Sequence, residues 1–178
     1  FDQPAGGSSG SVTWTVTTLI PLSYNIGFNG TGDQVYQYVL TITNPGATSI
    51  KLGFGTDIEY PSTTGAFGVD NLLIEETTSS VTSTLINDDF ESGVPANDWG
   101  AGSFQGDLST FLGLHGYSGA QKAMTEKTIF LGPSIDSTTI EFDFYEIDSW
   151  DGESFYFFLD DTMVYSRSFN QLSYDTPS

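Results

Sequence analysis

A period of two in the hydrophobic pattern is the feature that most constrains what this chain can fold into. Bulky apolar residues recur at every second position in Val35–Ile42 and again in Thr139–Tyr145. Successive side chains of a β-strand point to opposite faces of a sheet, so this spacing predicts strands with one face in a hydrophobic core. The same pattern, or a short apolar run, predicts further strands at Thr13–Thr18, Ile50–Phe54, Phe67–Ile74, Val81–Ile86, Ser154–Leu159 and Met163–Arg167.

Turn signals separate these segments. Asn44-Pro45-Gly46 ends one strand, and Asp160-Asp161 predicts a tight hairpin. Ser154–Leu159 is aromatic on both faces, which suits either a strand buried between layers or one in a wet groove. Ser118–Met124 is the one short stretch with helical character. Many short strands with regular turn signals predict an all-β fold, a jelly-roll-like β-sandwich.

The length of 178 residues, or 19.3 kDa, suits one domain with its own core. Residues 1–11, centred on a Gly/Ser cluster, are expected to be a linker or an exchanged N-terminal segment. Residues 12–178 are expected to form a single β-sandwich from two halves, 12–80 and 88–178. The absence of cysteine excludes disulfides, thiolate zinc sites and a cysteine nucleophile.

The charge of the chain restricts its partners. The formal net charge is −19, from 23 acidic and 4 basic residues. Such a chain repels phosphate backbones and anionic lipids, so we expect no nucleic-acid partner and no binding to membrane surfaces. No apolar run is long enough to span a bilayer, so we also expect no membrane insertion. An extracellular location, where millimolar calcium can neutralise the charge, fits this composition.

The densest acidic segment is Glu141–Glu153, which holds six carboxylates interleaved with aromatic residues. Such a cluster repels itself unless a cation binds it, and hard oxygen ligands at irregular spacing suit Ca²⁺. A turn at Gly152 would wrap Asp148, Asp151 and Glu153 around one ion, with Glu146 and Asp143 as weaker candidates. The spacing does not fit an EF-hand. A solvated acidic face is the alternative, but it would not need the interleaved aromatic residues.

The segment from Glu141 through Phe155, with the Leu159-Asp160-Asp161 turn that follows, resembles calcium-dependent ligand-binding modules of very large bacterial surface adhesins. The resemblance covers Asp88–Phe169 and, more weakly, Trp14–Ile74. It implies a β-sandwich that binds several calcium ions and recognises short peptides or sugars on other cells. It also implies that the carboxylates of the acidic segment are calcium ligands.

Two more segments resemble jelly-roll carbohydrate-binding modules. Asp88–Gly93, followed by Trp99, is similar to their first strand, and Phe67–Ile74 is similar to their last. In those modules the two strands lie side by side and hold a structural calcium ion. The resemblance therefore implies Asp70 and Glu91 as further calcium ligands, with Asp89 as a third candidate.

The closing motif here precedes the opening one. Three explanations fit: a permuted module whose termini are joined through Glu75–Asn87, a window cut out of phase from a tandem repeat, or a protomer that exchanges strands with neighbours. The similarity of Phe1-Asp2-Gln3 to Phe169-Asn170-Gln171 favours some periodicity.

Remaining polar residues have simpler interpretations. We expect Asp33, and Asp57 with Glu59, to lie in surface turns rather than at ions. We expect His115 to be a loop or core residue rather than a catalytic base. The Gly6–Gly10 segment matches the nucleophile-elbow pattern G-x-S-x-G, but it lies in a linker with no strand before it. We therefore expect no enzyme activity.

Two functions remain. The first is a calcium-stabilised structural or adhesive subunit of the cell surface, which polymerises into a filament through strand exchange with other copies of itself or with neighbouring repeats. The second is a calcium-dependent carbohydrate- or peptide-binding module of a large adhesin. In the second, the stacking candidates are Trp99, Tyr117, Tyr145 and Trp150, with core packing as the alternative for each. Asn29 is a glycosylation sequon that predicts an exposed surface.

Overall fold

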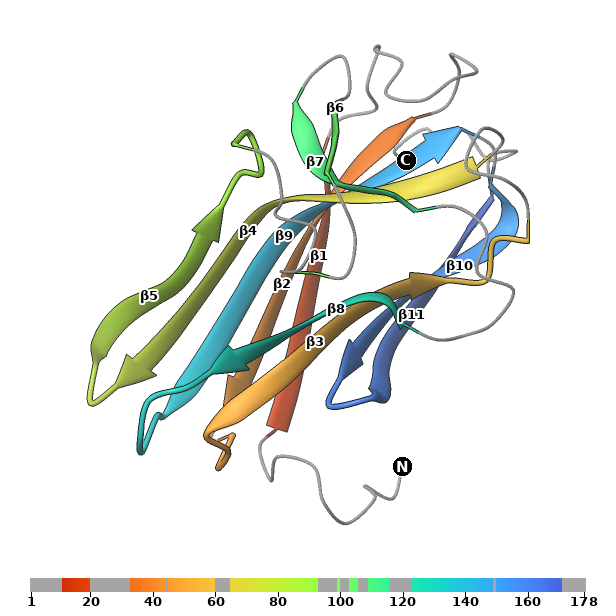
Figure 1. The fold of residues 1–178 in the computed structure, drawn as a ribbon. Coiled ribbons are helices and arrows are strands. Elements are labelled where there is room, and N and C mark those ends of the chain that lie inside the picture. The colour runs from red at the N-terminus through yellow and green to blue at the C-terminus, as the bar shows by residue number, and fades with distance from the viewer. Residues whose placement is uncertain are drawn as a thin grey trace.

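The chain is all-β, with its strands arranged in two antiparallel sheets (Figure 1). The computed structural model describes residues 11–19, 33–43, 45–59, 65–92, 99, 103–105, 109–115, 123–148 and 150–170. Within these ranges there is no helix, and hence none long and apolar enough to cross a membrane. The helical character expected for Ser118–Met124 is wrong where it can be compared, because Ala123 and Met124 begin a strand.

Seven strands form the larger sheet. Their order is β1 (Ser11–Leu19), β2 (Gln34–Thr43), β9 (Ser137–Asp148), β4 (Gly65–Thr78), β7 (Thr110–His115) and β6 (Ser103–Gln105), with β5 (Val81–Asp88) also paired to β4. The long strand β4 is bordered on one side by β9. On its other side it pairs first with β7 and then with β5.

Four strands form the smaller sheet. Their order is β11 (Thr162–Asn170), β10 (Asp151–Leu159), β3 (Ser49–Thr56) and β8 (Ala123–Phe130). This sheet packs against the larger one, since aromatic rings of β9 and β10 meet between them. Phe144 lies 4.3 Å from Phe155 and Phe142 lies 5.7 Å from Phe157, measured between ring centroids. The two sheets therefore share one core, as expected of a β-sandwich.

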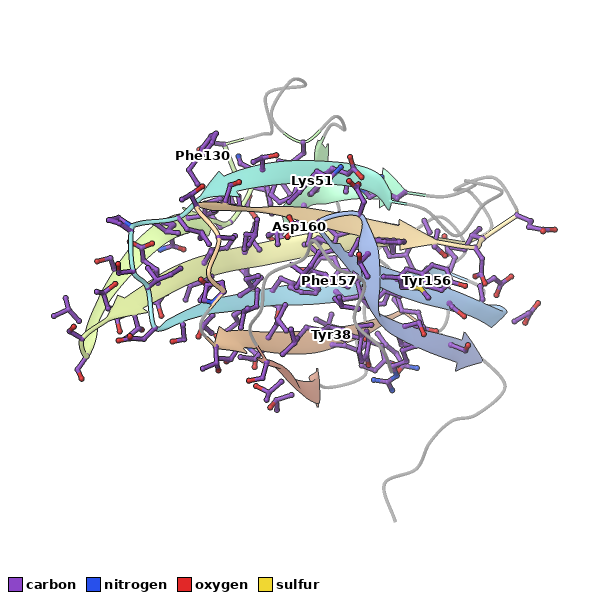
Figure 2. All side chains as sticks on the ribbon, turned by 90° about the horizontal axis from the view of Figure 1, so that it is seen from below. Tyr38, Lys51, Phe130, Tyr156, Phe157 and Asp160 are labelled. Atoms are coloured by element: carbon purple, nitrogen blue, oxygen red, sulfur yellow. The ribbon has the colours of Figure 1, made fainter. Side chains whose placement is uncertain are left out.

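The period-two pattern predicts the core positions of the central strands. On β2 the fully buried residues include Tyr38, Leu40 and Ile42, and on β9 they include Phe142 and Phe144. Figure 2 shows Tyr38 and Phe157 in the interior. Pairing of β2 with β9 brings these residues to the same face, with the Tyr38 and Phe142 rings stacked at 5.2 Å.

From Phe155 to Leu159, strand β10 is buried on both faces, which does not fit a wet groove. Tyr156 and Phe158, which alternate with the core residues, are only 4% and 7% exposed. They pair in register with Gly55 and Gly53 of β3. Glycine has no side chain to compete for space on that outer face, so the two rings can cover it.

The Asp160-Asp161 hairpin is confirmed. Both residues have positive φ, 48° and 63°, as the central residues of a type I′ turn require, and Leu159 pairs with Thr162. The turn is fastened to β3, because the Lys51 N–H donates to Asp160 Oδ1 at 2.8 Å and the Asp160 N–H donates to the Lys51 carbonyl (Figure 2). The Lys51 ammonium pairs with the Asp161 carboxylate.

The closing and opening motifs meet at one position of the β4–β5 hairpin, where Leu72 pairs with Asp88. Strands β4 and β5 pair from Leu72 with Asp88 to Thr78 with Val81. The opening motif itself differs from the expected strand, since β5 ends at Asp88 and the next residues form a turn. In that turn Phe90 has a φ of 54°, donates its N–H to Asp88 Oδ1 at 2.8 Å and buries its ring completely. Ser11, expected to end the linker, is the first residue of β1.

Candidate metal centres

Three buried carboxylates lie at one end of the sandwich, not close enough together to hold a metal ion, and we name Asp33, Glu146 and Asp148 the Asp148 cluster. Their side chains are 2%, 2% and 1% exposed. The Asp148 N–H donates to Asp33 Oδ1 at 2.7 Å, which joins the residue before β2 to the end of β9. The expectation that Asp33 lies in a surface turn is therefore wrong, because pairing of β2 with β9 draws it into the interior.

Glu146 shares the inward direction of the core residues of β9. The Tyr36 hydroxyl lies 3.0 Å from Glu146 Oε2 and 2.6 Å from Gln34 Oε1, and donates its single proton to this pair of acceptors. Burial raises the pKa of Glu146 to about 7, and the Asp33 charge acts in the same direction. The Tyr36 hydroxyl and the Arg167 charge oppose the rise.

Arg167 is the cationic residue that the described strands place beside this cluster. Its guanidinium lies over the Tyr36 ring, 4.5 Å from the centroid, and over the Phe169 ring at 5.0 Å. Both rings are buried, so the guanidinium is held by its aromatic neighbours as well as by charge. The cluster thus combines three carboxylates with one nearby positive charge.

The other predicted ligands in this segment lie differently. Asp151 is exposed and Glu153 is half-buried, and the Asp151 N–H donates to the Glu153 carboxylate. Gly152 has a φ of 117°, but it lies inside β10 where the pairing with β11 shifts register, so it marks an irregularity of the strand and not the expected sharp turn. Within the described ranges, no three His, Cys, Asp or Glu side chains stand close enough together to hold a metal ion. Asp148, Asp151 and Glu153 are not brought together as one ligand set.

A second group of carboxylates lies on the other face of β9, and we name Asp70 and Asp143 with their partners the Asp70 cluster. These two residues pair directly across β4 and β9. Asp70 Oδ2 accepts from the Ser109 and Tyr145 hydroxyls, each at 2.7 Å, and Asp70 Oδ1 accepts from the Asn71 N–H at 2.8 Å. The Asn71 side-chain amide donates to Asp143 Oδ2 at 2.8 Å.

Burial raises the pKa of both Asp70 and Asp143. At Asp70 the three hydrogen bonds oppose this effect, while the charge of Glu91 adds to it. Glu91 is thus near Asp70, as the resemblance to carbohydrate-binding modules implies, but its Oε1 already accepts from the Thr110 N–H at 3.0 Å. Asp89 is exposed and accepts from the Glu91 N–H at 3.2 Å within the turn.

Three of the four aromatic stacking candidates are buried. Trp99 is 1% exposed, Trp150 is fully buried and Tyr145 is 6% exposed. The Trp150 indole N–H donates to the Ala66 carbonyl at 3.1 Å, and the Tyr145 ring meets Phe111 edge-on at 5.2 Å. Core packing, the alternative for each of them, accounts for these three. Tyr117 and the sequon residue Asn29 lie outside the described residues.

His115 is a core histidine. It is buried against Phe67, with ring centroids 4.8 Å apart, and burial lowers its pKa to about 4. Its Nε2 has no hydrogen-bond partner among the described residues. Asp57 is structural, because it accepts from the Ser154 N–H at 2.6 Å and from the Tyr156 hydroxyl at 2.7 Å. Glu59 is exposed.

No model of a known protein family matches the chain, and no curated protein is significantly similar to it in sequence.

Several partners of the carboxylates were not singled out from the sequence, namely Gln34, Tyr36, Ser109 and Arg167. Ser109 and Arg167 reach their clusters through strand pairing and sheet packing, which leave no local pattern. The inward direction of Glu146, in contrast, follows from the local sequence pattern. Glu146 has the same parity along β9 as Phe142 and Phe144, so the alternation places it on the core face.

Proposed function

We propose that this chain is a calcium-stabilised, non-catalytic β-sandwich that serves as an extracellular structural or adhesive subunit of a cell surface. The observation that carries the proposal is the Asp148 cluster: three almost fully buried carboxylates lie near one guanidinium, although they do not stand close enough together to hold an ion unless binding draws them in. Its support is physical: buried carboxylates are costly unless a proton or a cation neutralises them.

The donor chemistry of the cluster suits calcium. Ca²⁺ prefers carboxylate and carbonyl oxygens, and it takes about six to eight of them. The described side chains supply only part of such a set, so main-chain carbonyls, hydroxyls or water would complete it. Bound there, the ion would neutralise charge and fix the start of β2 to the end of β9. In a chain with a net charge of −19 and no cysteine, such a staple would replace disulfides.

Among the three explanations for the inverted motif order, the β4–β5 hairpin supports a permuted jelly roll. It turns at Ser79 and Ser80 and pairs Leu72 of the closing motif with Asp88, the first residue of the opening motif, within one chain. Exchange of strands between protomers is then not needed to bring the two motifs together. Any assembly of copies would instead use the edges of the sheets.

The surroundings of the polar groups support a non-catalytic role. His115 is enclosed by the core, and the Asp70 carboxylate is occupied by fixed donors. The alternative function, a calcium-dependent carbohydrate- or peptide-binding module, would need aromatic residues other than Trp99, Tyr145 and Trp150 to contact the ligand, because these three are buried.

Thermal unfolding in calcium and in EDTA tests the proposal. We expect saturating calcium, at about 100 times its Kd, to add about 2.7 kcal/mol. For a domain of this size that is a rise of about 5–10 °C in Tm. Magnesium at the same concentration and sodium chloride at the same ionic strength control for simple screening of charge.

A variant pair assigns the effect to the cluster. Glu146→Gln with Asp148→Asn should lose most of the calcium response. Glu59→Gln with Glu126→Gln removes the same two charges at exposed positions and should keep it. A wild-type Tm that is equal in calcium and EDTA, or equal responses in the two variants, contradicts a calcium site at the Asp148 cluster.

A further inference from the structure

The outer edge of β1 differs from every other edge in the described part of the two sheets. Its pairing with β2 is regular, from Ser11 with Thr43 to Leu19 with Val35, without a register shift. Its sequence, SVTWTVTTL, contains no charged residue, no proline and no glycine. Among the described residues, no strand pairs with its other side (Figure 1). A long, regular, uncharged edge of this kind is a template for another strand.

The remaining edges carry the features that discourage such pairing. Strand β8 contains Glu126 and Lys127, and β11 contains Arg167 and pairs with β10 through two register shifts. Strand β5 pairs with β4 through a register shift and ends in Asp88, while β6 has only three residues. Charges, bulges and short length are the usual protections of an exposed edge.

Charge limits what can approach β1. Two copies of a chain with a net charge of −19 repel one another unless they meet where neither carries charge. Strand β2, next to β1, also has no charged residue. The exposed side chains at the start of β1, those of Ser11, Val12, Thr13 and Thr15, are uncharged as well. This neutral border suits a second neutral strand, and β1 of another copy supplies one.

We propose that β1 pairs antiparallel with β1 of a second copy, so that the two larger sheets become one continuous sheet across a two-fold axis. In full overlap Thr15 lies opposite Thr15 of the second copy, and no position brings two charges together. A two-fold contact uses the same surface on both partners, and it is the commonest symmetry of soluble oligomers. The inference deepens the proposed function, on which it rests, by naming the partner of a structural subunit.

Light scattering after size-exclusion chromatography tests the dimer. We expect the wild-type mass to approach twice 19.3 kDa at high concentration and to fall on dilution. Thr13→Lys with Thr15→Lys places lysines on the proposed interface and should give monomers. Thr82→Lys with Thr84→Lys makes the same charge change on exposed positions of β5 and should still give dimers.

Cysteine crosslinking gives a second measurement that does not depend on the lysine variant folding. The chain has no cysteine, so Thr15→Cys introduces a single thiol. Directly opposed residues of antiparallel strands have Cβ atoms about 4.5–5.5 Å apart, close to the span of a disulfide. Oxidation should therefore link two Thr15→Cys chains at low protein concentration, whereas Thr84→Cys chains should not be crosslinked.

A wild type that is monomeric at every concentration, a dimer that survives the β1 lysines, or equal crosslinking of the two cysteine variants would overturn the proposal. These outcomes are separate from the calcium test. The masses of the variants report on β1 whether or not calcium changes Tm, and the Tm response reports on the Asp148 cluster whether or not the chain dimerises.

Discussion

The Asp148 and Asp70 clusters occupy the same strand, β9, but they satisfy their carboxylates in different ways. On the outer face, Asp70 accepts hydrogen bonds from Ser109, Tyr145 and the Asn71 backbone, so its buried oxygens have neutral donors. On the core face, Glu146 accepts from the Tyr36 hydroxyl and Asp33 from the Asp148 N–H, and the Arg167 guanidinium adds a positive charge. Hydroxyl and N–H donors can stabilise a buried acid without any cation, so acidic density alone does not identify a cation site.

The largest expected effect concerns Glu146 without calcium. Its folded pKa, about 7, lies above the unfolded value of 4.5. The contribution of the protonated acid is therefore complete below pH 4.5 and is lost as pH rises through 7. In EDTA, Glu146→Gln should be more stable than wild type at pH 8 by about 3 kcal/mol, and the difference should vanish at pH 4.

Urea unfolding at both pH values measures this difference, and calcium sharpens it. With calcium present, the ionised Glu146 carboxylate would bind the ion. Glu146→Gln should then be less stable than wild type at pH 8. If Glu146→Gln changed stability in the same direction in calcium and in EDTA, the Asp148 cluster would not differ from the Asp70 cluster in needing a cation.

His115 should change the folding stability by a similar amount, but here stability is lost as pH falls and not as it rises. Its folded pKa, about 4, lies below the unfolded value of 6.5, so its contribution is present above pH 6.5 and is lost as pH falls through 4. Relative to His115→Phe, wild type should lose about 3 kcal/mol between pH 7 and pH 4. Denaturant titrations of both proteins at the two pH values measure it. An equal loss in both would mean that the imidazole is solvated.

Tyr145→Phe tests the neutral donors of the Asp70 cluster. Removing the hydroxyl leaves the buried Asp70 carboxylate with one donor fewer, which should cost about 1–2 kcal/mol by chemical denaturation. Ser109→Ala should cost less, because Ser109 is only partly buried and water can replace its hydroxyl. Neither substitution should change the calcium response, since both lie outside the Asp148 cluster. If Tyr145→Phe lost the calcium response, the ion would bind at the Asp70 cluster on the outer face of β9 and not at the Asp148 cluster.

The smallest effect is expected at exposed carboxylates. Lys51 pairs with Glu126 and Asp161 at the surface, where all three side chains are solvated. Lys51→Met should lower stability only slightly, because exposed ion pairs contribute little. The difference should shrink further in 0.5 M salt, as screening of a surface pair requires. A loss as large as that of Tyr145→Phe would show that exposure does not separate these carboxylates from the buried ones.

Much of the strand content follows from local sequence. The alternation in Val35–Ile42 and Thr139–Tyr145 predicts both the strands and their core faces, because a strand turns each second side chain the same way. The Asp160-Asp161 hairpin is equally local, since its two residues tolerate positive φ. Strands β6, β7 and β8 were missed, because β6 has only three residues, β7 carries a glycine in its interior and β8 is an edge strand with two charges.

The sequence by itself therefore determined the fold class, the core faces of the central strands and the acidic character of β9. Only the tertiary structure decided which carboxylates are buried and which donors meet them. Asp33 and Asp148 are 115 positions apart, and Ser109 is 39 positions from Asp70, so no local pattern relates them. Side-chain direction repeats every two residues within one strand, whereas the neighbours of a side chain depend on which strands pair and in which register.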